Sequence, residues 1–542
     1  MQKAARLSKI AAVGFLLGLM MIAAGPRAFS AGEIKKNETG FYRDVFDQNL
    51  YYEGTHFLHL DRLARAVTGK KVRALDVNVY DEVPDSGFFT NRHGREKMSA
   101  EELGKGCLEN SGPDLSAFTV TEGKFDGLHP RFMIKDSRGD AYELKFDGED
   151  GFELATGAEI VASRFLYALG YNVPQYTLGF FAAAQAKLDS AATIVDDSGF
   201  RKKFTQERLE KYLMFIPQDD QGRYRTSARK IPAGEPKGYF SFQGRRKDDP
   251  EDKINHEEMR SLRALRVFAA WINAYEIRES NTLDILTTEN AKRVLKHYLF
   301  DFSDAFGSSA AGAKPPMFTR EHLIDFGEAA KAFLSLGFWE KPWQKQWRES
   351  GQKTGAQALG YFNNRSFRTE KYKTLLPAYA FKDLSRADGF WAAKTMLSFT
   401  DEDIKALVKS GQFSHAGDAD TLAAVLIERR NLIVQYWFSK SGPLDDFEYQ
   451  SGRLTFKDAA VNAQMEPKDS TAYAVDIYAP GSNKSKPLGS FESKEPSLDL
   501  SRWSSSPALD AVIRTSRKST GKFPYVRVKI RDAHIAGIIH ED

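Results

Sequence analysis

The chain holds a single cysteine, Cys107, among its 542 residues, so no intramolecular disulfide can form. Stability must therefore come from hydrophobic cores rather than from covalent cross-links. The neighbours of this cysteine, Gly106 and Leu108, offer no group that would activate a thiol. We predict a buried or incidental cysteine rather than a nucleophile.

Long apolar runs are also scarce, and the most pronounced one lies near the amino terminus. Three basic residues precede the apolar run 10–24, and small residues follow it at Ala28 and Ser30. This order is typical of a secretory signal peptide. The run is too short for a comfortable membrane span. We predict a signal peptide at residues 1–30, export to the periplasm or the cell exterior, and no membrane-spanning segment.

Net charge is nearly absent as well. The formal charge of the whole chain is +4, and residues 1–30 hold four basic and no acidic residues, so the rest is formally neutral. A neutral protein lacks the bulk attraction for polyanions that nucleic-acid binding uses. We expect no nucleic-acid partner.

Several catalytic signatures are missing from the sequence. The ten histidines show no HExxH zinc spacing, and no GxSxG nucleophile elbow occurs. Carboxylates are plentiful, but no pair is singled out, so a glycosidase stays open as an alternative.

The periodicity of apolar residues changes twice along the chain. Short strand-like runs surround one helix up to about residue 181, the pattern past Gly307 is mainly helical to about residue 440, and the period shifts towards two after Gly442-Pro443. These patterns predict an α+β protein with a C-terminal β-sandwich-like domain. The predicted parts are an amino-terminal extension (31–110), a β-rich part with an insertion (111–250), a mainly helical part (251–442) and the β domain (446–542). Within the extension we predict a helix at 59–67 and a strand at 75–79.

A predicted helix leads into an irregular loop with two oxygen-bearing side chains. The helix covers residues 256–275, and Asn255 with Glu258 forms a capping signature at its start. The loop that follows carries Glu276 and, five positions later, Asn281.

A third oxygen-bearing side chain follows a predicted β-hairpin. Apolar runs at 283–286 and 294–300 flank the polar turn 287–290, and Asp301 comes directly after the second run. The hairpin would bring Glu276, Asn281 and Asp301 to one end. Because Mg²⁺ prefers hard oxygen ligands, we predict a magnesium–phosphate site there.

A lysine ends the third of three predicted strands. The strands are 118–120, 131–135 and 141–146. The loop at 121–129 holds Gly123 and Gly127, and the third strand ends near Lys145. A glycine-bearing loop followed by a strand lysine is what protein kinases place over ATP phosphates. A lysine on the solvent face of a strand is the alternative.

The helix predicted at 156–169 carries Glu159 in its first turn. The helix dipole favours a carboxylate there regardless of function. The functional alternative pairs Glu159 with Lys145, so that the ammonium is fixed where phosphate oxygens can reach it. Glu153 is a competing partner.

Lys145, Glu159, Glu276, Asn281 and Asp301 occur in the order of the protein-kinase signature. The chain therefore resembles an atypical, exported member of the kinase-like fold, akin to secreted and spore-coat kinases. It also resembles a group of large exported bacterial proteins in its DEVPDSGFFTNR, LKFD, GYNVP and HYLFDF stretches. The resemblance covers roughly residues 75–440. It implies a bilobal kinase-like core with a β-rich small lobe and a mainly helical large lobe.

The resemblance also implies roles for individual residues. Lys145, helped by the glycine loop, would contact nucleotide phosphates, and Glu159 would orient it. Glu276 would accept the substrate hydroxyl proton, and Asn281 and Asp301 would bind Mg²⁺. The cofactors implied are ATP or another nucleotide and Mg²⁺, and the partner is a protein or small-molecule hydroxyl acceptor.

The sequence departs from the kinase pattern in two places. Glu276 stands where protein kinases have the loop aspartate that accepts the hydroxyl proton. The triplet after the hairpin is Asp301-Phe302-Ser303 instead of Asp-Phe-Gly. The literal Asp-Phe-Gly triplet begins at Asp325, but it follows residues 320–324, which we predict as helix. Asp325 also lies 44 positions after Asn281, too far for one hairpin. We therefore reject it as a metal site.

Two classes of function fit these patterns. The first is an exported, Mg²⁺-dependent phosphotransferase. The second is a catalytically silent kinase-like envelope protein that binds or scaffolds a partner through its cleft or its C-terminal domain, and the scarcity of ATP outside the cytoplasm favours it. Glycan binding through the C-terminal domain is a third idea.

Overall fold

The computed structural model describes most of the chain. The described residues are 34–57, 71–109, 111–124, 131–195, 200–309, 311–341, 343–345, 348, 358–481, 486–517 and 521–541. The predicted signal peptide, the helix predicted at 59–67 and Gly127 lie outside them. In the part of the chain that is described, no helix is both long and apolar enough to cross a bilayer.

A seven-stranded sheet forms the β-rich part, with strand order β4-β7-β3-β2-β1-β5-β6. Its strands are β1 (Phe118–Lys124), β2 (Arg131–Asp136), β3 (Ala141–Phe146), β4 (Tyr176–Phe181), β5 (Ala186–Val195), β6 (Arg201–Lys203) and β7 (Tyr224–Lys230). β2 pairs antiparallel with both β1 and β3. β1 runs on to Lys124, so Gly123 lies on a strand opposite Phe132 rather than in the predicted loop.

The two faces of this sheet have different chemistry because successive side chains of a strand point to opposite sides. On one face, Tyr142, Leu144 and Phe146 of β3 join an apolar core with helix α7 (Gln206–Leu213). The other residues of β3, Glu143 and Lys145, therefore face the opposite side, where helix α6 (Leu154–Leu169) lies against β3, β4 and β7.

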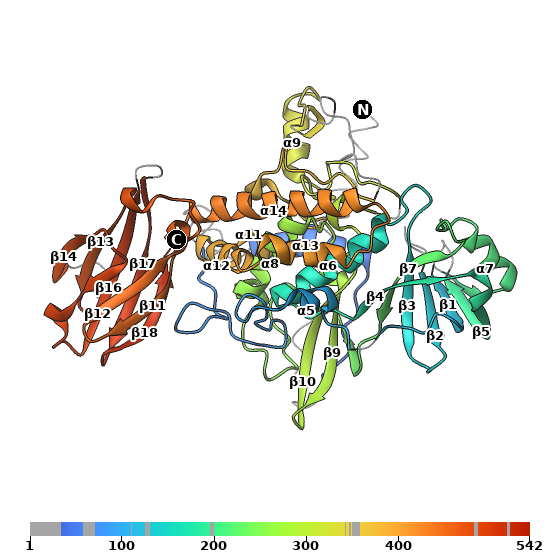
Figure 1. The fold of residues 1–542 in the computed structure, drawn as a ribbon, viewed down its shortest axis with the longest axis horizontal. Coiled ribbons are helices and arrows are strands. Elements are labelled where there is room, and N and C mark those ends of the chain that lie inside the picture. Colours follow the sequence, from blue (N-terminus) through green and yellow to red (C-terminus); the bar gives the residue numbers. More distant parts are fainter. Residues whose placement is uncertain are drawn as a thin grey trace, which may run out of the picture.

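The helical part surrounds a large second core. Helices α8 (Arg260–Ile272), α11 (Tyr379–Lys382), α12 (Arg386–Leu397), α13 (Asp401–Lys409) and α14 (Ala416–Phe438) contribute to it together with α6. Figure 1 shows these helices between the seven-stranded sheet and the C-terminal sheets. Shorter helices are α5 (Ala100–Lys105) and α9 (Phe326–Leu334).

The helix predicted at 256–275 is shorter than expected. A 3₁₀ turn, η3 (His256–Glu258), precedes α8, and the chain leaves the helix at Asn273 with a φ of 56°. The predicted capping box is wrong, because the Asn255 amide donates to the Glu258 carboxylate instead of capping backbone N–H groups.

The predicted hairpin is present and longer than expected. β9 (Thr282–Glu289) pairs with β10 (Lys292–Leu299) on one side and with β8 (Glu235–Gly238) on the other, which makes a three-stranded sheet. The turn consists of Asn290 and Ala291, both with positive φ. Such a two-residue turn matches the twist of paired strands, so Thr287–Glu289 stay in the ladder instead of forming the predicted loop.

The strand predicted at 75–79 is wrong. Residues 71–80 form no strand, and Leu75 and Val79 are about half exposed. The Asn78 side chain accepts hydrogen bonds from the backbone N–H groups of Tyr80 and Glu82, at 2.9 and 3.1 Å. This local turn competes with extended pairing.

The C-terminal part consists of two antiparallel sheets around their own apolar core. One contains β11 (Leu444–Gln450), β12 (Arg453–Asp458) and β15 (Ser497–Asp499), and the other β14 (Gly489–Ser493), β13 (Thr471–Tyr478), β16 (Ala508–Arg517), β17 (Gly521–Arg531) and β18 (His534–His540). They lie at the opposite end of the molecule from the seven-stranded sheet (Figure 1). The predicted α+β class with a C-terminal β part is confirmed.

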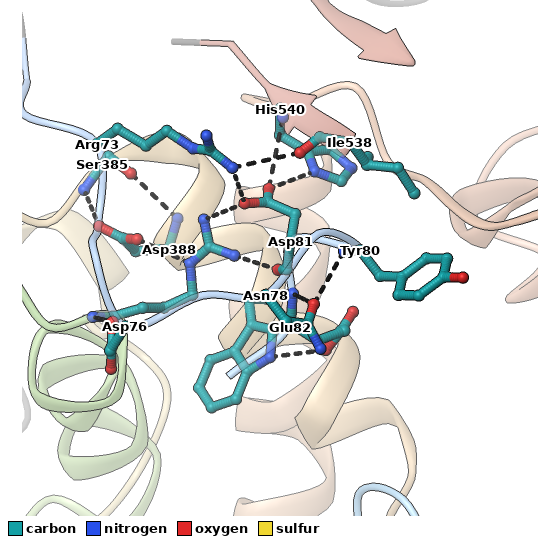
Figure 2. A network of polar contacts seen from close by, with 12 residues as sticks. Arg73, Asp76, Asn78, Tyr80, Asp81, Glu82, Ser385, Asp388, Ile538 and His540 are labelled. Atoms are coloured by element: carbon teal, nitrogen blue, oxygen red, sulfur yellow. Dashed lines mark hydrogen bonds and ion pairs between the residues drawn. The ribbon is translucent and has the colours of Figure 1, made fainter. Parts of the chain in front are cut away.

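Asp81 joins the extension, the helical part and the C-terminal sheets (Figure 2). Its carboxylate accepts from Arg260 at 3.1 Å and from Arg73 at 3.2 Å, and it lies 2.8 Å from Nδ1 of His540 on β18. Burial would raise the pKa of Asp81, but Arg260 and His540 outweigh it and lower that pKa. Asp388 of α12 binds both Arg260 and Arg263, at 3.0 and 3.3 Å.

We predict that Asp388→Ala strongly destabilises the protein, because two fully buried guanidinium groups lose a carboxylate. Breaking a buried ion pair from one side costs about 3–5 kcal/mol. Urea unfolding should show a loss of this size. The matched control is Asp383→Ala, whose side chain is 30% exposed and 4.0 Å from Lys71; it should cost less than about 1 kcal/mol. Equal losses in the two variants would contradict the assigned role.

Candidate functional site

Lys145 lies between two carboxylates that come from distant parts of the sequence. Its Nζ is 3.2 Å from Oε1 of Glu159 on α6 and 2.6 Å from Oδ1 of Asp301, two residues beyond the end of β10. The lysine side chain is only 6% exposed. A strand, a helix and a hairpin therefore meet at one ammonium group.

Glu159 is completely buried and has a second partner. Ser227 of β7 donates its hydroxyl to Oε2 of Glu159 at 2.9 Å. The competing residue, Glu153, instead lies 3.5 Å from Arg225 and accepts from the backbone N–H of Ser414 at 2.8 Å. Glu159 rather than Glu153 is thus the helix carboxylate that contacts Lys145.

Asp147 fixes the start of α6 and so the placement of Glu159. Its carboxylate accepts from the backbone N–H groups of Glu153, Ala155 and Thr156 at 2.8–3.0 Å. These N–H groups have no partner inside the helix, and an acceptor at that end also suits the helix dipole. The helix begins at Leu154, so Glu159 lies in its second turn instead of the predicted first turn.

Asp301 has a left-handed backbone conformation, with a φ of 67°. Its N–H donates to the Tyr176 hydroxyl at 3.1 Å, and Ser303 donates to its Oδ1 at 3.0 Å. Aspartate tolerates this conformation better than most residues do. The turn directs a carboxylate that is 20% exposed towards Lys145.

The loop after α8 is tied to the end of the hairpin. The Asn281 side-chain amide donates to the backbone carbonyl of Glu276 at 3.0 Å, and the Phe300 N–H donates to the Asn281 backbone carbonyl at 3.1 Å. Asp304 accepts from the N–H groups of Tyr275 and Glu276, at 2.5 and 2.7 Å. The structure therefore gathers Glu276, Asn281 and Asp301 at one end of the hairpin.

Two cations flank Glu276. Lys314 lies 3.2 Å from its Oε1 and Arg278 lies 3.3 Å from its Oε2. Burial opposes ionisation, but Lys314 and Arg278 lower the pKa of Glu276 in spite of it. The carboxylate is therefore ionised at neutral pH and can accept a hydrogen bond from a hydroxyl group.

Electrostatics keep Lys145 charged. Burial alone would lower its pKa, but the carboxylates of Asp301 and Glu159 raise it. Burial raises the pKa of Glu159, and it raises that of Asp304 to about 7.

Several contact residues were not predicted from the sequence. They are Asp147, Tyr176, Ser227, Ser303, Asp304 and Lys314. Asp304 and Ser303 adjoin the Asp301 motif, and Asp147 ends the LKFD stretch, so their positions were a usable signal. Lys314 lies in an irregular loop, where nothing in the sequence pattern indicates its contact with Glu276.

The literal Asp-Phe-Gly triplet that begins at Asp325 has a structural role. Asp325 caps α9 by accepting from the Glu328 N–H at 3.2 Å, and it pairs with Lys373 at 2.5 Å. The helix predicted at 320–324 is absent, because these residues form turns and a bridge.

A magnesium ion fits the chemistry of the predicted ligands. Asp301 offers a carboxylate, and the Asn281 amide nitrogen is engaged with Glu276, which leaves its oxygen as the coordinating atom. Mg²⁺ commonly takes one or two protein oxygens and keeps several waters. Among the described residues there is no cluster of three or more His, Cys, Asp or Glu suited to a metal.

No protein-family model and no curated protein sequence matches the chain. A solved structure, the proinflammatory kinase CtkA of Helicobacter pylori, matches with 9% identity over 57% of this chain and 94% of its own, with a TM-score of 0.28. Such a likeness concerns the fold alone and says nothing of the reaction.

Glu279 is a buried acid within the loop that carries Glu276 and Asn281. It accepts from the Phe242 N–H at 2.7 Å and the Ser241 hydroxyl at 3.1 Å. Burial, and then the charge of Asp44, raise the pKa of Glu279 to about 8. The folded protein therefore favours the protonated acid.

We predict that Glu279→Gln changes how stability depends on pH. The carboxyl pKa of Glu279 is higher in the folded than in the unfolded protein. The protonated acid therefore contributes stability that is fully present below the pKa of the unfolded chain and is lost as pH rises through about 8. The wild type should lose up to a few kcal/mol relative to Glu279→Gln between about pH 5 and pH 8. Urea unfolding at several pH values measures this difference. The control, Glu402→Gln, changes a side chain that is 81% exposed and should run parallel to the wild type. A parallel Glu279→Gln curve would contradict the prediction.

Proposed function

We propose that this protein is a kinase-like phosphotransferase that moves a phosphoryl group from a nucleotide, such as ATP, to a hydroxyl acceptor with the help of Mg²⁺. One observation carries the proposal: Lys145 lies within 3.2 Å of Glu159 and 2.6 Å of Asp301. Phosphoryl transfer uses this set, because a strand lysine contacts phosphates, a helix glutamate orients it and an aspartate holds the metal.

The residues divide the task between binding and alignment. Lys145 would exchange Asp301 for phosphate oxygens while Glu159 and Ser227 hold its position. Asp301 and Asn281 would bind Mg²⁺, which supplies charge neutralisation for the transferred phosphoryl group when bound. Positioning and charge supply most of the catalysis in such reactions, so few groups suffice.

Glu276 would act on the acceptor. Its carboxylate is kept ionised by Lys314 and Arg278, so it would accept a hydrogen bond from the substrate hydroxyl and align it. The glutamate side chain is one methylene longer than the aspartate of protein kinases. The backbone N–H of Glu276 donates to Asp304 at 2.7 Å, which holds the residue in place.

We also propose that the protein works outside the cytoplasm, as the pattern at residues 1–30 indicates. The acceptor would be a protein or a small molecule of the cell envelope. The C-terminal sheets would provide a contact for an envelope partner.

A second candidate is a catalytically silent kinase-like binding protein. The Lys145–Asp301 pair must open before a nucleotide can enter. On the same face of β3, Glu143 binds Arg229 at 2.5 Å and Arg131 at 3.6 Å, and Arg229 lies over the Phe300 ring at 4.6 Å. These largely buried charged side chains lie beside Lys145, whereas pockets for small ligands are lined mostly by apolar groups.

We predict that ATP with Mg²⁺ raises the melting temperature, whereas ATP with a chelator does not. At a ligand concentration of 100 Kd the stabilisation is about 2.7 kcal/mol. Asp301→Asn should abolish the Mg²⁺ dependence and lower phosphate transfer from labelled ATP to envelope extracts by on the order of 100-fold.

Asp325→Asn is the matched control. Asparagine also caps helices, and Asp325 begins the literal Asp-Phe-Gly triplet that we reject as a metal site. The variant should transfer phosphate like the wild type. Absence of any nucleotide stabilisation, or equal transfer by wild type and Asp301→Asn, would favour the silent alternative.

A further inference from the structure

The segment 34–57, here called the amino-terminal segment, packs against the loop that carries Glu276 and Asn281. It contains α2 (Phe41–Phe46), the π-helical turn η1 (Asp47–Tyr51) and α3 (Tyr52–Phe57). More than two hundred residues separate it in sequence from the 3₁₀ turn η4 (Glu279–Asn281) that it contacts.

A backbone contact anchors the start of this segment. The Asn37 N–H donates to the Lys237 carbonyl at 2.8 Å, and the Tyr239 N–H donates to the Asn37 carbonyl at 3.2 Å. Gly238, between them, has a φ of 96°, and a Cβ there would lie 1.3 Å from the Asn37 oxygen. This close approach requires glycine at position 238.

Asp44 makes the central contact. It is 1% exposed, and its Oδ2 accepts from both the backbone N–H and the hydroxyl of Ser280, at 2.9 and 2.6 Å. Ser280 lies in η4, directly before Asn281, and Arg278 also donates to its hydroxyl. A buried carboxylate thus holds the turn between Glu276 and Asn281.

The neighbours of Asp44 contact the same loop at other points. Val45 packs against the apolar cluster of Tyr275, Leu375 and Leu376, and Tyr275 directly precedes Glu276. The Phe41 ring lies 5.0 Å from the Arg278 guanidinium, which binds Glu276. One short segment therefore contacts the loop at both ends and in its middle.

We propose that Asp44 is a positioning residue for the proposed phosphotransfer, because it holds η4 and thereby the relative places of Glu276 and Asn281. This inference rests on the proposed function. Within the described residues Asp44 has no direct ion pair, so hydrogen bonds from Ser280 are its main compensation. Burying a carboxylate in this way is costly, whereas an apolar side chain would pack the segment at lower cost. The carboxylate is thus suited to ordering the loop.

The experiment compares Asp44→Ala with Asp47→Ala in the full-length protein. Asp47 lies one turn further along, is 18% exposed and pairs with Arg43 at 3.5 Å instead of with the loop. Hydrogen–deuterium exchange of a peptide spanning 275–282 reports on the turn. The rate of turnover with ATP and Mg²⁺ reports whether a change in the order of the turn affects catalysis.

Asp44→Ala should speed exchange in this peptide and lower kcat by about 10- to 100-fold, the usual effect of losing a group that orients metal ligands. The nucleotide KM should change far less, since Lys145 and Glu159 do not contact Asp44. Asp47→Ala should match the wild type in both measurements. Asp44→Asn should recover most of the activity, because the amide oxygen still accepts from Ser280.

Two outcomes separate the inference from the proposed function. Unchanged exchange in Asp44→Ala, or faster exchange with unchanged kcat, overturns the role of Asp44 while leaving phosphotransfer intact. A wild type that neither binds nor turns over nucleotide overturns the proposed function and the catalytic role of Asp44 with it. If Asp44→Ala fails to fold, Ser280→Ala removes the hydroxyl donor and should change exchange and kcat in the same direction by a smaller factor.

Discussion

The ion pairs of Lys145 with Glu159 and Asp301 are the interaction on which the rest of the site depends. Taking an ammonium and two carboxylates out of water is expensive, and only close pairing with additional hydrogen bonds compensates for it. The structure provides these bonds through Ser227 on Glu159 and Ser303 on Asp301. A cluster of this cost is weak as a stability device, in keeping with the ligand-binding role proposed above.

The fold supplies one rigid support for each member of this cluster. Asp147 fixes the start of α6, the hairpin ladder delivers Asp301, and Asp304 holds the backbone of the neighbouring loop. The buried network around Asp81 performs a comparable task further away, where it joins the C-terminal sheets to the helical part. The site therefore rests on secondary structure and buried polar contacts rather than on free loops.

Local sequence patterns predicted those parts of the structure that local physics decides. The hairpin before Asp301, α6 with Glu159 and the alternation in the C-terminal strands follow from periodicity and turn residues. Gly123 was misplaced because β1 pairs with two neighbouring strands, and the strand at 75–79 failed because Asn78 forms a turn. Lys314 and Asp44 reach the site through tertiary contacts between distant segments, for which a single sequence contains no signal.

The most direct measurement of the central claim is a crystal structure of the protein with Mg²⁺ and a non-hydrolysable ATP analogue. We predict that Lys145 leaves Asp301 to contact a phosphate oxygen and keeps its bond to Glu159, and that Asp301 and Asn281 coordinate the metal. An analogue bound elsewhere, with the Lys145–Asp301 pair intact, would contradict it.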